Sequence, residues 1–263
     1  MKAIVLALIL TGLTIPQAKA EIIPFNIDLN FDGGLSESQE SIFSEAESFW
    51  EGVIIGYDGN VSFPTGLLIT AKAEDIDGTG GILGSAGPSS GYQNRSLDNN
   101  LFYASKGNMV FDTSDLDKLE SEGTLLSVII HEMAHVIGFG TLWSADYNNL
   151  YNDGTGQYTG AYALAAYKAE FDSSATHVPI ELDGGEGTED AHWDETWGGP
   201  QSDIMTGYLE GSVTYSNTTL AAFKDLGYLT VSSLIESTEI SDVPVPLISF
   251  LSIFGFLFFK NRK

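Results

Sequence analysis

The chain of 263 residues contains no cysteine, which excludes both disulfide bonds and thiolate ligands for a metal ion. Basic residues are also scarce, with 11 Lys and Arg against 36 Asp and Glu. All of the acidic residues lie between residues 21 and 242, together with only six of the basic ones, so this body carries a net charge of −30. A surface of that charge argues against nucleic acid or anionic lipid as a partner.

Long apolar runs are absent as well, because neither apolar end of the chain reaches the ~20 residues typical of a membrane-spanning helix. At the start, Lys2 precedes an apolar segment at residues 3–13, and Ala18-Lys19-Ala20 forms a small-x-small cleavage site. This order is typical of a secretory signal peptide and predicts one at residues 1–20. An uncleaved anchor is the alternative, and the apolar segment is short for that role.

The other end combines Val243-Pro244-Val245-Pro246, an apolar segment at residues 247–259 and a basic end. As a helix that segment would reach ~20 Å, against ~30 Å for the hydrocarbon core of a bilayer. The tail resembles the PEP-CTERM sorting signals of Gram-negative bacteria, although Val245 stands where that pattern has a glutamate. The resemblance implies removal by a membrane-bound sorting enzyme; a simple C-terminal membrane anchor is the alternative. We therefore expect an exported protein, secreted or associated with the cell envelope.

The body between these ends can bury one sizeable core, and its periodicity predicts an α+β fold. Phe25, Ile27, Leu29 and Phe31 alternate with polar residues, which indicates a strand. Two further strands are expected at residues 62–69 and 70–76, and residues 101–112 are expected to form a strand, a turn at Gly107-Asn108 and a second strand; residues 77–90 are expected to be a loop. Helices are predicted after the capping-box residue Ser36 and at about residues 112–121, 124–138, 160–171 and 216–226.

Histidine is rare too, and two of the four histidines lie in the motif His131-Glu132-Met133-Ala134-His135. Positions i and i+4 share one face of a helix, so His131 and His135 can bind the same zinc ion. Glu132 follows the first ligand and can act as a general base toward a water molecule. The apolar residues before the motif provide the helical context that this pattern requires. A chance match on an ordinary core helix is the alternative.

A catalytic zinc ion typically has three protein ligands, so one more is needed. The compact pattern H-E-x-x-H-x-x-G-x-x-H fails here, because Gly138 is in place but Thr141 occupies the third ligand position. Candidates for the third ligand are Glu170, on the following predicted helix, and the two remaining histidines, His177 and His192. His192 is the best of these, because Asp203-Ile204-Met205-Thr206-Gly207 follows it as a candidate methionine turn.

At this point the chain resembles the leishmanolysin family, in which an insertion separates the first two histidines from the third. Four further stretches carry the resemblance, which covers roughly residues 22–230: residues 107–112, 138–143, 178–188 and 220–228. It implies a metzincin-type zinc endopeptidase acting on protein or peptide substrates. One catalytic Zn²⁺ would be held by His131, His135 and His192, with Glu132 as general base and Met205 in the methionine turn.

The resemblance also implies a domain organisation. A catalytic domain would cover residues 21–230, with a strand-rich part at about 21–140 that includes the active helix and an irregular part at about 141–230. Residues 231–242 would then be a linker, and residues 243–263 the tail. Metzincin substrates lie extended along an edge strand, which we expect within residues 101–111. Eukaryotic members of the family are rich in disulfides and use a propeptide cysteine for latency, and neither feature is available here.

Three further readings stay open at the level of sequence. A non-catalytic surface or matrix protein could keep this scaffold as a binding module, although the intact Glu132 argues against it. Tyr208 is a candidate for stabilising an oxyanion, with a packed tyrosine as the alternative. Asp75-Ile76-Asp77-Gly78 begins like a calcium loop, but its glycine comes too early and no glutamate closes it, so no specific motif supports calcium. The sequence sets no oligomeric state.

Overall fold

A computed structural model of the chain describes residues 22–58, 61, 65–94, 100–185, 187–208 and 213–231. The predicted signal peptide, the C-terminal tail and nearly all of the predicted linker lie outside these residues. Within them, no helix combines the length and the apolar character needed to cross a membrane. The proposed division of the catalytic domain near residue 140 stays a prediction.

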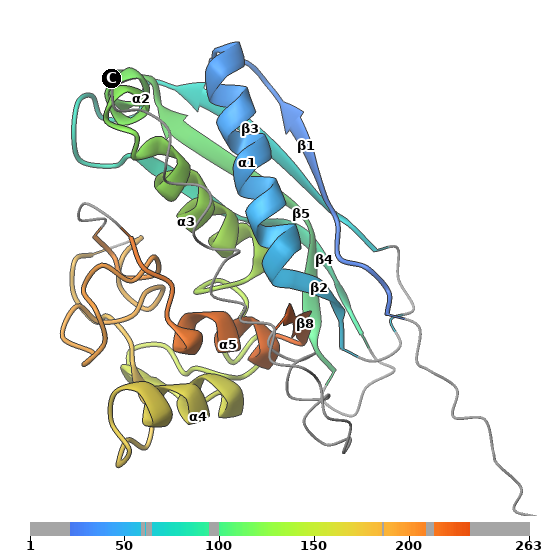
Figure 1. Cartoon of the computed structure of the whole chain (residues 1–263), viewed down its shortest axis with the longest axis vertical. Helices are drawn as coiled ribbons and strands as arrows, with labels where there is room; N and C mark the ends of the chain where they lie inside the picture. The colour runs from blue at the N-terminus through green and yellow to red at the C-terminus, as the bar shows by residue number, and fades with distance from the viewer. Residues whose placement is uncertain are drawn as a thin grey trace, which may run out of the picture.

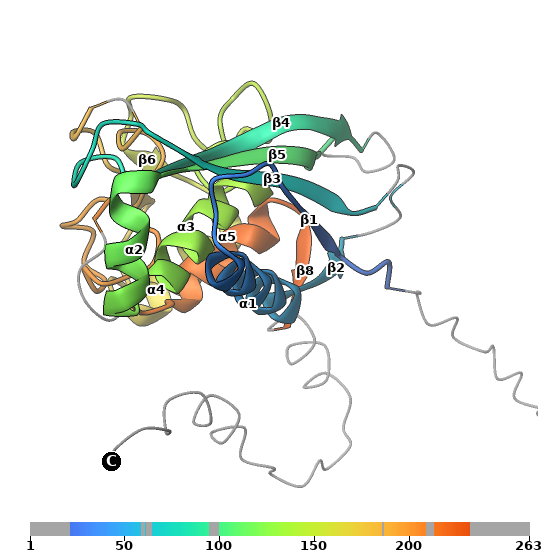
Figure 2. The same ribbon diagram turned by 90° about the horizontal axis from the view of Figure 1, so that it is seen from above.

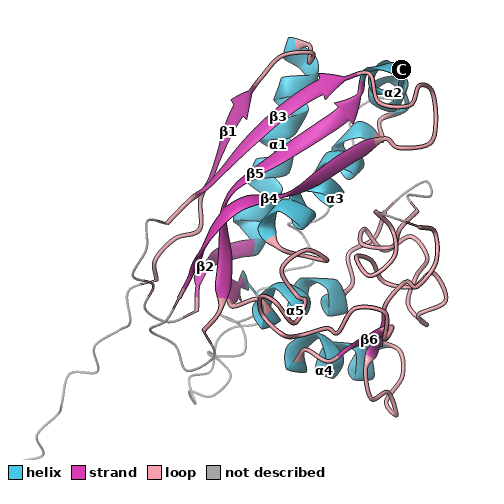
Figure 3. Cartoon of the chain, turned by 180° about the vertical axis from the view of Figure 1, so that it is seen from behind, coloured by secondary structure: helices cyan, strands magenta, loops and turns pink. Residues whose placement is uncertain are grey.

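A four-stranded mixed sheet supports the upper half of the molecule in Figure 1. Its strands follow the spatial order β1 (Ile27–Phe31), β3 (Leu67–Glu74), β5 (Phe102–Asp112) and β4 (Gly84–Gln93). The first three run parallel, and β4 pairs antiparallel with β5 at the edge of the sheet. Figure 3 shows that no helix of the described residues covers the far face of this sheet, and the described core lies on the other face.

Three helices cover that other face: α1 (Glu37–Val53), α2 (Thr113–Glu122) and α3 (Leu125–Ile137) (Figure 2). The predicted capping box begins α1, since the Ser36 hydroxyl and the Gln39 side chain each accept the other residue's backbone N–H. The helix buries Phe43, Ala46 and Trp50. The Trp50 indole N–H donates to the Ile130 carbonyl of α3 at 3.0 Å, which fastens α1 to α3 across the core.

The lower half contains α4 (Ala161–Glu170), α5 (Asn217–Asp225), the short strands β6 (Gln157–Tyr158) and β7 (Val178–Pro179), and long loops. The two helices cap each other. Glu170, at the end of α4, accepts the backbone N–H groups of Asn217 and Thr218, while Asp225 accepts those of Tyr162 and Ala163. Each carboxylate satisfies donors that have no partner inside their own helix. Glu170 is therefore a helix cap, and the sequence reading of it as a metal-ligand candidate is wrong.

The α+β class and the five main helices are confirmed, but several strand predictions are wrong. Residues 77–90, expected to be a loop, contain the start of the edge strand β4. Among residues 65–76 there is one strand, β3, which runs through residues 69 and 70, where two predicted strands were expected to meet. The sequence missed β2 (Ile54–Tyr57), which pairs with β8 (Tyr228–Thr230) directly before the expected linker. Residues 102–112 form one continuous strand, β5, with no turn at Gly107-Asn108.

Close packing against α3, rather than a turn, explains the glycine at position 107. A Cβ atom at this position would lie 2.2 Å from Cγ1 of Val136 on α3 and 2.9 Å from the Gly87 carbonyl oxygen of β4. The glycine therefore lets the active helix approach the sheet closely. This contact brings α3 and the edge strand β4 together, which matters for the site described below.

Replacing Gly107 by Ala should lower the free energy of unfolding by about 1–3 kcal/mol, because the methyl group overpacks the contact with Val136. Gly52 in α1 is the matched control, since a Cβ there meets no atom within 4 Å. Gly52→Ala should leave stability unchanged or raise it slightly, because alanine favours a helix over glycine. Urea unfolding curves of both variants provide the measurement. Equal effects of the two substitutions would show that Gly107 is not a packing constraint.

Candidate metal centre

The helix α3 is buried almost throughout, because its sequence is apolar on all sides. Every residue from Val128 to Ile137 is buried, including His131, Glu132 and His135. Gly138 ends the helix with a φ of 138°, a backbone conformation that other residues rarely adopt. The turn it makes brings the Phe139 carbonyl within 2.9 Å of Nδ1 of His135. The glycine of the motif therefore both stops the helix and helps to orient a histidine.

Three imidazoles meet at one point between the two halves of the molecule. The Nε2 atom of His131 lies 3.0 Å from that of His192 and 3.1 Å from that of His135, and the last two are 3.1 Å apart. All three side chains are at least 94% buried, with exposed fractions of 6%, 4% and 6% respectively. His177 is not in this cluster, because its ring bonds only to the neighbouring Thr176 hydroxyl among the described contacts. Of the two candidate histidines, the structure therefore brings His192 to the site.

The opposite ring nitrogen of each histidine is held by a backbone carbonyl. The Nδ1 contacts are His131 to Ile204 at 2.5 Å, His135 to Phe139 at 2.9 Å and His192 to Thr188 at 2.9 Å. A carbonyl can only accept, so each Nδ1 carries the proton and each Nε2 presents its lone pair to the common point. Metal-binding histidines typically have such partners, which fix the tautomer and the direction of the ring.

Burial also keeps these rings neutral. It lowers the pKa of His131 to about 3, with the nearby His192 ring contributing. Burial and the two neighbouring rings hold the pKa of His135 well below its usual value, and burial lowers that of His192. Protons therefore do not compete for the three Nε2 lone pairs near neutral pH.

This set of donors fits a zinc ion. Zn–N bonds of about 2.0–2.1 Å in tetrahedral geometry separate the ligand nitrogens by about 3.3 Å, close to the spacing of the Nε2 atoms. Imidazole nitrogen suits zinc well, whereas calcium and magnesium prefer oxygen ligands. Three histidines also leave a fourth coordination position open, as catalytic zinc sites require.

A tight turn at Asp203–Thr206 lies against the histidines and contains Met205, which is completely buried. The Thr206 N–H donates to the Asp203 carbonyl at 3.1 Å, which closes the turn. The Ile204 carbonyl is the partner of His131, and the Met205 carbonyl accepts the N–H of Trp193 at 2.9 Å. The predicted methionine turn is therefore in contact with both parts of the histidine cluster.

Glu132 lies next to the start of the edge strand. A Cβ atom placed on Gly84 of β4 would lie 3.4 Å from Cγ of Glu132, so the start of β4 lies beside this side chain. Burial raises the pKa of Glu132 to about 8. A divalent cation at the three histidines would act in the opposite direction and favour the carboxylate form.

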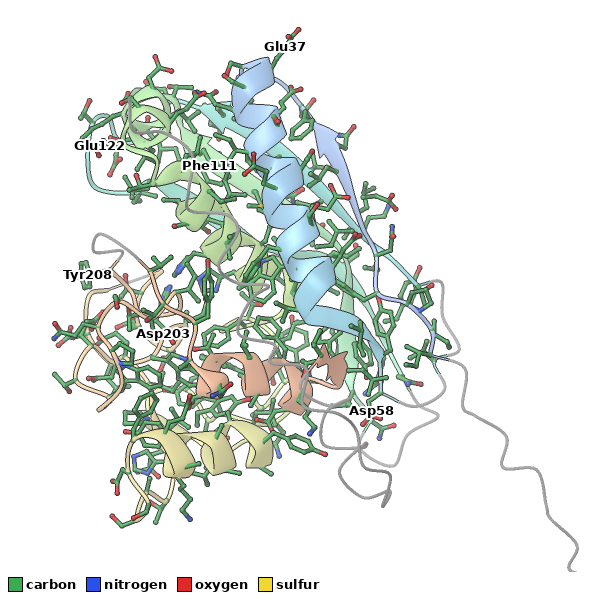
Figure 4. The ribbon with its side chains drawn as sticks, viewed as in Figure 1. Glu37, Asp58, Phe111, Glu122, Asp203 and Tyr208 are labelled. Carbon is green, nitrogen blue, oxygen red and sulfur yellow. The ribbon has the colours of Figure 1, made fainter. Side chains whose placement is uncertain are left out.

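Tyr208 is 58% exposed at the outer edge of the loops, so the packed-tyrosine reading is wrong (Figure 4).

Sequence reasoning missed several partners of the site. The carbonyls of Phe139, Thr188 and Ile204 could not be found from side-chain identity, because every residue has a carbonyl. Asp203 lies two residues before Met205 in the methionine-turn sequence. This position was the only feature of the sequence that could have pointed to Asp203 as a partner of the site. Its hydrogen bonds involve Ser216 and Thr219, 13 and 16 residues away, so they depend on the tertiary fold.

Comparison with known families agrees with this geometry. The sequence model of the leishmanolysin family matches residues 103–234, a span of about half of the chain. The match includes the active helix, the three histidines and the methionine turn. No curated protein matched the chain in a separate comparison. With a matching family model and a buried cluster of three histidines that fits zinc, the chain belongs to the leishmanolysin family of metallopeptidases.

Proposed function

We propose that this protein is an exported zinc endopeptidase in which His131, His135 and His192 bind the metal and Glu132 is the general base. The observation that carries the proposal is the convergence of three Nε2 atoms at 3.0–3.1 Å, with every Nδ1 committed to a carbonyl. A buried cluster held in this way has little use as a purely structural feature, because three desolvated imidazoles without a ligand leave polar atoms poorly satisfied.

The chemistry divides between the metal and the protein. A zinc ion held by the three histidines would polarise the scissile carbonyl and make a water acidic enough to attack near neutral pH. Glu132 accepts a proton from the attacking water and delivers it to the nitrogen of the leaving amine. Met205 supports the site through its turn, which places the Ile204 carbonyl against His131.

The substrate would lie along β4, the edge strand of the sheet. Residues 101–111 were expected to provide this edge, but β5 lies between β3 and β4 and has both sides paired. One side of β4 pairs with β5, and no other described strand pairs with its outer side, where an extended peptide would add by backbone hydrogen bonds near Gly84. The proximity of Gly84 to the Glu132 side chain supports this choice, because a peptide at the start of β4 would lie near the proposed general base. Recognition through the backbone suits an endopeptidase acting within a chain.

Export is the second part of the proposal. Residues 1–20 have the order of a signal peptide, and residues 243–263 have that of a sorting signal or anchor. The body between them has no cysteine, so it needs no disulfide formation at its destination. A Gram-negative cell envelope would be the site at which the tail is inserted or processed.

Replacing Glu132 by Gln should reduce casein hydrolysis by about 10²–10⁴-fold, because the amide cannot accept a proton from water. Zinc content should stay at the wild-type level, since the three histidines remain. Metal analysis and initial rates on the same purified sample provide both measurements. Hydrolysis by this variant at a near wild-type rate would refute the general-base assignment, and an inactive wild-type protein that binds zinc would favour the non-catalytic alternative.

Replacing His192 by Ala should weaken zinc binding by more than about 100-fold, because it leaves two protein ligands where a catalytic site has three. His177→Ala is the matched control and should change neither zinc content nor activity, since that ring contacts Thr176 outside the cluster. Zinc affinity is measured by competition with a chromophoric chelator. The ligand assignment fails if the His177 variant loses zinc while the His192 variant keeps it.

A chain that ends at Asp242 should be soluble and should keep full stability and activity, because the last described strand, β8, ends at Thr230. A chain that ends at Leu226 is the control. It lacks β8 and the buried Tyr228, whose hydroxyl donates to the Ile137 carbonyl at 3.0 Å, and it should unfold at a lower temperature. Thermal unfolding and membrane fractionation of both forms test the role of the tail. Aggregation or inactivity of the Asp242 form would mean that the tail belongs to the fold.

A further inference from the structure

Asp203 is a completely buried carboxylate at the junction between the methionine turn and α5, beside the N-terminal end of that helix in Figure 4. Both of its oxygens act as acceptors. Oδ1 accepts the Met205 N–H at 3.0 Å and the Thr219 hydroxyl at 2.7 Å, and Oδ2 accepts the Ser216 N–H at 3.0 Å. Burial raises the pKa of Asp203, while these hydrogen bonds oppose that shift. All of its partners are donors, so the site is built for a charged carboxylate.

The Thr219 hydroxyl extends this contact to the segment of the third histidine. It donates to Asp203 and accepts the indole N–H of Trp193 at 2.8 Å. Trp193 is the residue directly after His192, and its own backbone N–H bonds to the Met205 carbonyl. The side chain and the backbone of Trp193 are therefore both fixed by groups that Asp203 holds.

The same carboxylate also reaches the first histidine. By accepting the Met205 N–H, Asp203 fixes the turn that contains Ile204. The Ile204 carbonyl is the partner of Nδ1 of His131 at 2.5 Å. Two of the three histidines, from segments 61 residues apart, thus depend on one buried group that lies outside the cluster.

We propose that Asp203 is a positioning residue that sets the relative placement of His131 and His192, through Ile204 on one side and through Thr219 and Trp193 on the other. The inference rests on the proposed zinc site and assigns to it a partner beyond the carbonyls that contact the rings. An amide cannot replace the carboxylate, because its NH₂ group would face a donor at Thr219 or at Ser216. The backbone turn would then shift, together with the ring that it supports.

Asp203→Asn in the full chain is the first test, because asparagine preserves shape and removes one acceptor. Zinc affinity, measured by chelator competition well below the unfolding temperature, should fall about 10–100-fold, as is typical when a partner of a metal ligand is lost. Cobalt(II), bound in place of zinc, should show an altered visible absorption spectrum, because this spectrum depends on ligand geometry. A loss of general stability alone would not change either quantity under conditions in which the variant is folded.

Asp225→Asn is the matched control. Asp225 is also a buried carboxylate, and it accepts the N–H groups of Tyr162 and Ala163 and the Tyr158 hydroxyl. These bonds support α4 rather than the histidines. The substitution should lower the unfolding temperature to a similar degree, while the zinc affinity and the cobalt spectrum stay at wild-type values.

A pair at Thr219 keeps the test decisive if the Asp203 variant does not fold. Thr219→Ser preserves the hydroxyl and should retain the wild-type zinc affinity. Thr219→Val preserves the shape but removes the link between Asp203 and Trp193, and it should weaken zinc binding about 10-fold or more. Equal zinc affinity in the serine and valine variants would overturn the inference.

The inference is also overturned if Asp203→Asn binds zinc as tightly as the wild type, or if Asp225→Asn weakens binding just as much. Either result would leave Asp203 with a purely structural role while the zinc site stands. A wild-type protein that fails to bind zinc would instead refute the proposed function itself. The two failures are therefore distinguishable.

Discussion

The central constraint in this protein is the burial of three imidazoles that must all face one point. A buried ring nitrogen without a partner is costly, so each Nδ1 is held by a backbone carbonyl, at Phe139, Thr188 or Ile204. Those carbonyls come from the end of the active helix, from the loop before His192 and from the methionine turn. The rest of the fold therefore has to hold three irregular backbone segments in fixed positions.

Without disulfides, aromatic packing and buried carboxylates hold these segments. The Trp193 ring stacks on that of Trp197 with the ring centroids 5.7 Å apart, and it contacts the Phe139 ring edge-on with the centroids 5.0 Å apart. These contacts join the loop of the third histidine to the end of α3. Carboxylates then accept backbone N–H groups at places where helices or turns begin. Asp203 does so at the methionine turn and α5, as Asp225 does at α4. Part of the large acidic content is thus structural rather than a solvated surface.

The sheet positions the other side of the site. Gly107 allows Val136 of α3 to approach β5 and β4 closely, and Gly84 then lies next to Glu132. The glycine-rich composition of residues 77–90 suggested a loop because glycine and serine have low strand propensity. Pairing with β5 overrides that propensity in β4. Close approach of the helix explains both Gly107 in the strand and the wrong prediction of a turn there.

The sequence alone determined the α+β class, the active helix with His131, Glu132 and His135, and the two candidates for a third histidine. These features are local, because the period of a helix places positions i and i+4 together. The choice of His192, which lies 57 residues beyond His135, rested on the candidate methionine turn after it and on a resemblance until the fold brought its Nε2 atom to the other two. Tertiary structure alone decided the edge strand, the carbonyls that orient the rings and the hydrogen bonds of Asp203. These depend on backbone groups that every residue carries, so only the path of the chain selects the ones that meet.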